Sequence, residues 1–221
     1  DEPVASSATG TQKSLALWDP AFRATPEDSD FSNASGPGSF SYAHTVPFAL
    51  RKQQWGNTFA GNQAILANRG PTYVEPSPLN TGTWTLKQDG ANPPVANYDT
   101  PLGTASNTLL IHGGRTTWEG NMCLNDNSNK FISEPDPQEV IFTFTGITTV
   151  VDRNKPDNLF MNENDATRAI STAAQTTLGG SAENFRNAFL RSYAGGGGAT
   201  PQITINGAGA NISWTIDPFW D

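Results

Sequence analysis

The chain has 221 residues and a formal net charge of −8 at pH 7, with 36% hydrophobic and 15% charged residues. Its length favours one domain, or at most two, with a core that needs no metal ion or disulfide bond to stabilise it. The acidic balance argues against nucleic acid as a main partner, because phosphate binding requires clustered Lys and Arg, and the longest basic cluster here is Arg51-Lys52.

Signals for membrane insertion or secretion are not evident within these residues. No apolar run reaches the roughly eighteen residues that a membrane-spanning helix needs. No charged start is followed by an apolar stretch, so we expect any signal or anchor to be missing or to have been removed upstream of Asp1. Cys123, the single cysteine, has no intrachain disulfide partner. Low charge with abundant Asn, Thr, Ser and Gly is typical of secreted bacterial surface proteins, and we expect an extracytoplasmic location.

In the first part of the chain, short apolar runs are broken by Pro, Gly, Asn and Asp, which predicts strands and long loops. Residues 13–18 are expected to form a short helical turn or a surface strand. Residues 40–44 alternate with period two, which predicts a strand with Phe40, Tyr42 and His44 on one face.

The middle of the chain is predicted to form a predominantly antiparallel sheet. The all-apolar run 64–67 predicts a central strand covered on both faces, and residues 83–86 alternate as a further strand. Residues 140–151 predict a hairpin around Gly146. Two more strands are marked by two pairs of apolar residues, Leu109 with Ile111 and Met122 with Leu124.

Helical patterns are confined to the last part of the chain. Asp165 is a candidate cap for a helix over residues 166–178. A second helix is predicted from Ser181 to Gly195, because the aromatic residues Phe185, Phe189 and Tyr193 recur at every fourth position. Residues 202–206 and 211–216 alternate and predict a terminal hairpin. The expected fold class is therefore α+β, a single domain over residues 1–221 with an antiparallel sheet, long loops and one or two late helices.

Candidates for catalysis are few, because the chain has only two histidines. His44 lies in an aromatic strand and is interpreted as a core or interface histidine. His112 precedes Gly113 and Gly114, an arrangement similar to the oxyanion loop of some esterases, but no Gly-x-Ser-x-Gly motif accompanies it. A hydrolase that uses His112 with Cys123 or a loop carboxylate remains an alternative, whereas we expect a protein that is not an enzyme.

Two kinds of ligand are compatible with the sequence. Amide and carboxylate oxygens at Asn125, Asp126 and Asn127, and again at residues 162–165, suit calcium, but neither cluster has the spacing of a helical calcium loop. Such clusters more often form side-chain turns, so we expect no cofactor, with calcium as the alternative. Sugars are the second kind, because loops that carry Trp55, Trp84 and Trp118 could stack on a polysaccharide.

A structural interpretation also accounts for the residues around His112. Two glycines after His112 permit backbone angles that other residues rarely adopt. Asp126 and Asn127 suit a tight turn between strands at 121–124 and 130–132. We therefore expect His112, Gly113, Gly114 and Asp126 to form a turn-and-strand unit that requires no chemistry.

Several segments, in order, resemble a known family. They are Gly38-Ser39-Phe40-Ser41-Tyr42-Ala43, Gln63-Ala64-Ile65-Leu66-Ala67-Asn68-Arg69-Gly70-Pro71, Asn107 to Gly114 with Gly120-Asn121-Met122-Cys123-Leu124-Asn125-Asp126-Asn127, and Asp157-Asn158-Leu159-Phe160. They are similar to segments in the heads of prepilin-like proteins, the relatives of type II secretion pseudopilins and type IV pilins that planctomycete-type bacteria encode as many paralogues. The chain departs from the family in its longer spacing between His112 and Asp126, and in having Asn127 where the family has Gly.

This resemblance implies a non-enzymatic pilin-like head that acts as a structural or secretion-associated protein. The implied partners are further copies of itself or other pilin-like subunits. The family's N-terminal apolar helix is not within residues 1–221, so membrane anchoring before processing is expected only if such a helix precedes Asp1. A secreted β-rich module that binds extracellular polysaccharide is the alternative function.

Overall fold

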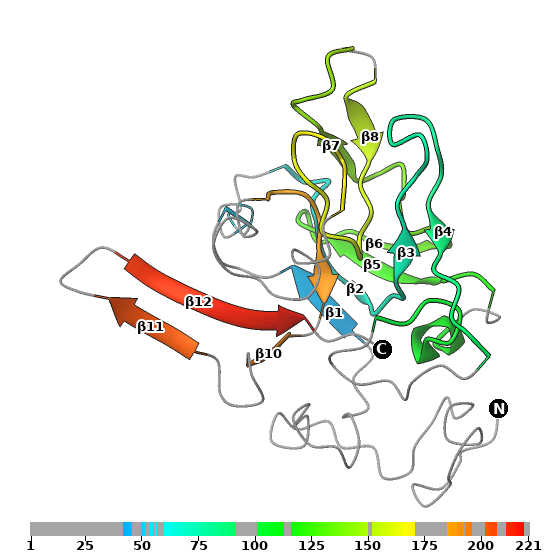
Figure 1. Cartoon of the computed structure of the whole chain (residues 1–221), viewed down its shortest axis with the longest axis horizontal. Helices are drawn as coiled ribbons and strands as arrows, with labels where there is room; N and C mark the ends of the chain where they lie inside the picture. The colour runs from blue at the N-terminus through cyan, green and yellow to red at the C-terminus, as the bar shows by residue number, and fades with distance from the viewer. Residues whose placement is uncertain are drawn as a thin grey trace, which may run out of the picture.

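The computed structural model describes residues 42–45, 50–51, 54, 56, 60–91, 101–112, 116–149, 152–170, 185–191, 193–195, 202–206 and 211–218. Strands joined by loops dominate this part of the chain (Figure 1). The strands are β1 Tyr42–Thr45, β2 Ala64–Asn68, β3 Tyr73–Val74, β4 Thr85–Leu86, β5 Gly120–Leu124, β6 Asn129–Ile132, β7 Ile141–Thr143, β8 Asn154–Pro156, β9 Leu190–Arg191, β10 Tyr193–Gly195, β11 Gln202–Asn206 and β12 Asn211–Pro218. A short 3-10 helix, η3, spans Asn107–Leu110.

The largest sheet has five strands in the order β6-β5-β2-β1-β9, and every neighbouring pair is antiparallel. Its strands come from distant parts of the sequence, so β1 lies between β2 and the late strand β9. In Figure 1 the hairpin β7–β8 and the pair β3–β4 lie beside this sheet, and β11 with β12 extends to the other side. The expectation of a predominantly antiparallel sheet is therefore confirmed.

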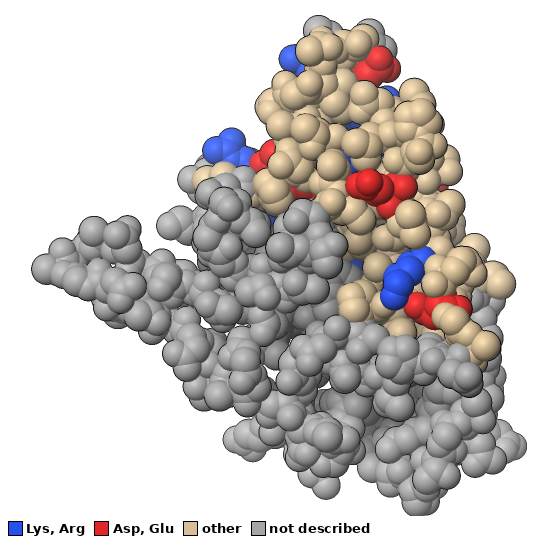
Figure 2. Space-filling model, in the orientation of Figure 1, with Lys and Arg blue, Asp and Glu red and all other residues tan. Residues whose placement is uncertain are grey.

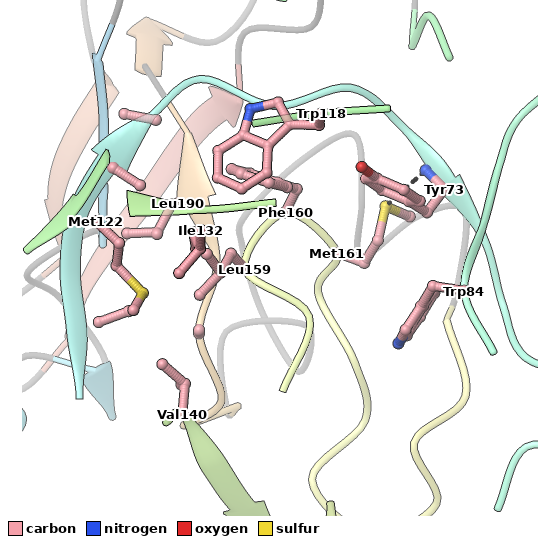
Figure 3. Packing of buried hydrophobic residues seen from close by; sticks show 14 of the residues in the cluster. Tyr73, Trp84, Trp118, Met122, Ile132, Val140, Leu159, Phe160, Met161 and Leu190 are labelled. Atoms are coloured by element: carbon pink, nitrogen blue, oxygen red, sulfur yellow. Dashed lines mark hydrogen bonds between the residues drawn. The ribbon is translucent and has the colours of Figure 1, made fainter. Parts of the chain in front are cut away.

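The core lies against one face of the five-stranded sheet. Ala43, Ala67 and Met122 from β1, β2 and β5 are at most 1% exposed and pack with residues of the loop that follows β8. Figure 3 shows Trp118 against Phe160, with ring centroids 4.7 Å apart at an interplanar angle of 70°. Burial of these large side chains provides the main driving force for folding of this region.

Several strand predictions hold, with changes at their edges. β1 exposes Tyr42 and buries Ala43, so Tyr42 and the half-buried His44 share a face as predicted, whereas Phe40 and residues 13–18 lie outside the described residues. The terminal hairpin is confirmed by the pairing of β11 with β12. β2 is central, but the prediction that both of its faces are covered is wrong, because Leu66 is 39% exposed.

The late helices differ from the prediction wherever the structure describes them. Residues 165–167 form a turn, and Ile170 makes an isolated β-bridge with Glu163. The predicted second helix contains instead β9 and β10. Residues 171–184 lie outside the described part of the chain.

Two predictions for the middle of the chain also need correction. Leu109 lies in η3 and not in a strand, because the Ser106 side chain accepts a hydrogen bond from the Thr108 amide and caps a 3-10 turn. The hairpin predicted around Gly146 is wider, because β7 pairs with β8 and the Gly146 amide donates to the Ala166 carbonyl.

Candidate functional site

The face of the five-stranded sheet that points away from the core is formed by alternate residues of its strands. Paired residues of antiparallel strands share a face. The registers therefore place one row across β1, β2, β5 and β6, namely His44, Leu66, Cys123 and Asn129. Tyr42 lies on the same side of β1, and the pair Asn121 and Phe131 lies on the same side of β5 and β6. We call the surface formed by these seven residues the outer face.

The outer face carries three exposed hydrophobic side chains and no charged residue. Tyr42 is 44% exposed, Leu66 39% and Phe131 58%, and none of its seven residues is Lys, Arg, Asp or Glu. These three account for most of the large hydrophobic residues that are exposed in the described part of the chain. A cluster of exposed apolar side chains on one sheet face is typical of a surface that contacts another macromolecule.

His112 packs against the edge of the outer face. Its ring meets Phe131 edge to face, with centroids 5.6 Å apart, and its Nε2 atom lies 3.5 Å from the Nδ2 atom of Asn121. Cys123 is half-buried, and its thiol lies 3.6 Å from its neighbour's carbonyl oxygen, that of Leu124. His112 thus contacts Asn121, and the Cys123 thiol contacts the Leu124 carbonyl. Among the described residues, no hydrogen bond joins His112 to Cys123. Gly113 and Gly114 lie outside them.

Asp126 and Asn127 lie in the turn that joins β5 to β6. The Ser128 amide donates to Asp126 Oδ1 at 2.9 Å, and the Asn127 amide donates to the Leu124 carbonyl at 2.9 Å. Asn127 adopts a left-handed conformation with a φ of 65°, which Asn tolerates better than most residues. The side chain of Asn125 donates to the Gly56 carbonyl. Of the side-chain oxygens that the calcium hypothesis assigned to a metal ion, Asp126 Oδ1 is the acceptor in this turn, and the hypothesis stays untested.

Two of the three tryptophan candidates for sugar stacking, Trp84 and Trp118, are buried. Trp84 is 8% exposed and Trp118 1%, and Trp118 Nε1 donates to the Arg69 carbonyl at 2.8 Å. Both line a groove of about 610 Å³, together with hydroxyl side chains such as Thr116. Their low exposure leaves little of either ring available to a sugar, and the stacking hypothesis stays a prediction. Trp55 lies outside the described residues.

The most unusual feature of the structure is a set of charged residues inside it. We call Arg51, Asp157, Glu163, Asp165 and Arg168 the buried charge cluster; all but the half-buried Asp165 are at most 3% exposed. The cluster lies beside the core, where the loop after β8 meets the segment 185–191 and the short segment around Arg51. Ionised groups are rarely buried unless they are paired.

The two arginines of the cluster are held by oxygen atoms on all sides. Arg51 donates to Asn162 Oδ1 at 2.7 Å and to the carbonyl of Asn187 at 2.8 Å. Arg168 donates to Glu163 Oε1 at 3.1 Å and to the carbonyl of Leu79 at 3.0 Å. Each guanidinium thereby joins segments that are far apart in the sequence.

The carboxyls of the cluster are strongly perturbed. Burial raises the pKa of Asp157 to about 7, and burial together with the neighbouring Asp157 raises the pKa of Glu163 well above its ordinary value. Burial also raises the pKa of Asp165.

The sequence interpretation missed this cluster. It singled out residues 162–165 as a calcium candidate, Asp165 as a helix cap, and Asp157 as part of a family resemblance. The available signal was the apolar run from Leu159 to Met161, which is flanked on both sides by an acid and an amide. In the described residues no group of three or more His, Cys, Asp and Glu side chains is arranged to hold a metal ion.

Comparison with known proteins adds no relative: no family model matches the chain, and neither a curated protein nor a solved structure shows significant similarity to it. None of the helices that the structure describes combines the length and the apolar character needed to span a membrane.

Proposed function

We propose that this protein is a non-enzymatic, extracytoplasmic structural subunit of the pilin-like class, and that it packs against another copy of itself through the outer face. The observation that carries the proposal is the exposure of Tyr42, Leu66 and Phe131 on one uncharged sheet face. The ordered segments that resemble prepilin-like heads supply the class.

Charge favours a second copy as the occupant of the outer face. Two chains that each carry a net charge of −8 repel one another on approach. On the face of the molecule shown in Figure 2, Asp and Glu side chains are scattered among uncharged residues. The outer face contains no carboxylate, so two copies can meet there without bringing like charges together.

Self-association and its loss on substitution test this proposal. Sedimentation velocity over a range of concentrations should show reversible association of the parent chain. Phe131→Ser should weaken that association at least about tenfold, because burial of a large aromatic side chain at an interface is lost, and it should leave the melting temperature nearly unchanged.

Ile141→Ser is the matched control, because Ile141 is 41% exposed but lies on β7, away from the outer face. It should leave association unchanged. A parent chain that stays monomeric at every accessible concentration, or equal effects of the two substitutions, would contradict the proposed interface. The class is tested separately by the gene sequence upstream of Asp1, where we expect an apolar helix and where an ordinary cleaved signal peptide would refute the pilin assignment.

A further inference from the structure

The hairpin of β11 and β12 separates apolar from polar residues. Paired residues of antiparallel strands share a face, as do alternate residues along each strand. One side of the hairpin is formed by two apolar pairs, Ile203 with Trp214 and Ile205 with Ile212, and we call it the hairpin face. The other side is formed by three polar pairs, Gln202 with Thr215, Thr204 with Ser213 and Asn206 with Asn211.

The hairpin extends away from the five-stranded sheet of its own chain. Its base is joined to that sheet, because β12 pairs with β10, and β10 follows the edge strand β9 closely in the sequence. From this base the two strands run outward (Figure 1). Among the named elements, the extensive contacts of β11 and β12 are with one another and with β10. The pair Ile205 and Ile212 therefore lies near the end of the hairpin that is farther from its own sheet.

A sheet with one apolar face is stable when another layer of structure buries that face. Two strands by themselves are only marginally stable in water. In proteins built from two packed sheets, the apolar alternate residues of both inner faces meet in a layer about 10 Å thick. The outer face offers such a surface, with Tyr42, Leu66 and Phe131 exposed on it.

Charge also makes the hairpin face and the outer face compatible. Residues 192–216 contain no Lys, Arg, Asp or Glu, and the outer face contains none. Both surfaces are thus uncharged parts of a chain whose net charge is −8. Contact between them joins two copies without placing like charges opposite one another.

We propose that the hairpin of one copy packs on the outer face of another copy, where β11 and β12 form a second sheet layer over Tyr42, Leu66 and Phe131. The inference rests on the proposed function, because it names the segment of the second copy that covers the outer face. The contact joins two different surfaces, so each copy contributes one hairpin and one outer face. Such contacts either close into a dimer that exchanges hairpins or continue from copy to copy.

A charge on the hairpin face tests this contact. Ile205→Asp should weaken self-association at least about tenfold in sedimentation velocity, because the contact would then bury an unpaired carboxylate. Thr204→Asp is the matched control, since it adds the same charge at the neighbouring position on the polar side of the hairpin, and it should associate as the parent chain does. If Ile205→Asp does not fold, Ile212→Asp, at the paired position, provides the same comparison. Equal association of Ile205→Asp and Thr204→Asp would overturn the inference and leave the proposed function standing, provided that Phe131→Ser still weakens association.

Mixing two variants tests whether the contact joins two different surfaces. Phe131→Ser retains an unaltered hairpin, and Ile205→Asp retains an unaltered outer face. An equimolar mixture should therefore associate at least about tenfold more tightly than either variant does alone. A symmetric contact of outer face with outer face predicts instead that the mixture associates no better than Ile205→Asp alone, and that result would refute the hairpin contact.

Cys123 reports which copy supplies the hairpin. It is the single cysteine of the chain, and it lies half-buried on the outer face. Its rate of alkylation by N-ethylmaleimide should fall as the concentration of the parent chain rises, and it should stay constant for Ile205→Asp. A parent rate that is independent of concentration but increases in Ile205→Asp would mean that the hairpin covers its own chain, which contradicts exchange between copies. A parent chain that remains monomeric would refute both this inference and the proposed function.

Discussion

Asp126 shows how one exposed side chain can stabilise a turn. Hydrogen bonds from Ser128, made by its side chain and its amide, lower the pKa of Asp126, which means that the ionised form is favoured in the folded protein. Its contribution is therefore present above the ordinary pKa of an aspartate and is lost as the pH falls below it. The left-handed Asn127 completes the turn, so the sequence of these two residues suffices to explain the local geometry.

We expect Asp126→Ala to lower the melting temperature modestly at neutral pH, because the bond to the Ser128 amide is lost. Addition of calcium, or of a chelator, should not shift the melting temperature of the parent chain. Thermal unfolding followed by circular dichroism measures both. Asp152→Ala is a suitable control, because Asp152 is half-exposed and its ion pair with Lys155 is long, at 3.8 Å. A calcium-dependent stabilisation abolished by Asp126→Ala would identify a metal site instead.

At the scale of single residues, predictions from the sequence succeeded where a residue's conformation depends on its neighbours in the sequence. Asn127 could be assigned a left-handed turn because its own side chain and its neighbours determine that conformation. Arg51 could not be placed, because nothing near it in the sequence indicates that its partners are Asn162 and Asn187. Charged residues are usually exposed, and only the folded chain shows which of them are paired inside.

At the scale of elements, the side chain of Arg191 attaches β9 to the rest of the protein in addition to the pairing of β9 with β1. This residue is 3% exposed, and its guanidinium donates to the carbonyls of Gly70, Pro71 and Phe160. It thereby joins an edge strand to the loop after β2 and to the core. A planar guanidinium can bond several carbonyls at once, whereas the single ammonium of Lys cannot reproduce that geometry.

Arg191→Lys should therefore lower the free energy of unfolding by about 3 kcal/mol, because at least one buried carbonyl loses its donor. Urea unfolding at fixed pH measures the loss. Arg186→Lys provides the matched control, since Arg186 is exposed and should tolerate the change. Equal stability of the two variants would mean that Arg191 does not anchor the strand.

Periodicity identified most strands but misidentified β9 and β10 as helix, for a definite reason. Phe185, Phe189 and Tyr193 are spaced four residues apart, and a spacing of four satisfies the period of two in a strand as well as that of a helix. The first predicted helix differs only over its described residues, 166–170: Asn164 Oδ1 caps the amides of Ala166 and Thr167, but the chain then turns at Arg168, whose φ is 67°. A capping signal begins a turn, and only the following residues decide whether it becomes a helix.

On the scale of the whole molecule, carboxyl groups in the interior and on the surface have opposite effects on how the stability of the protein depends on pH. Burial raises the pKa of Asp136 to about 6 and that of Asp157 to about 7. Exposed carboxylates have lowered pKa values, as Glu139 does because of its hydrogen bond with Lys130. They stabilise the protein when ionised, and this stability is lost only at much lower pH. The interior groups therefore determine how stability depends on pH between about 4 and 7.

We expect the melting temperature to be lower at pH 8 than at pH 5.5, by roughly 5 °C, the shift that about 2 kcal/mol produces in a chain of this size. Differential scanning calorimetry across this range measures it. Asp136→Asn should remove part of the dependence, because it eliminates one of the raised carboxyls. A melting temperature that rises steadily towards pH 8 would contradict the assignment of the buried carboxyls as protonated groups.

The long sequence separations within the buried charge cluster also determine when the protein can fold during its synthesis. The hydrogen-bond partners of Arg51 follow it in the sequence by 111 residues (Asn162) and by 136 residues (Asn187). Arg191, which bonds the Gly70 carbonyl, follows Gly70 by 121 residues. Contacts between residues so far apart in the sequence form slowly, because a long loop must close before any of them is made. A chain still emerging from the ribosome, or crossing a membrane, exposes unpaired arginines and an incomplete sheet until residue 191 is available. Completion of the fold is thus timed by its late segment, and premature termination before that point leaves a chain prone to aggregation.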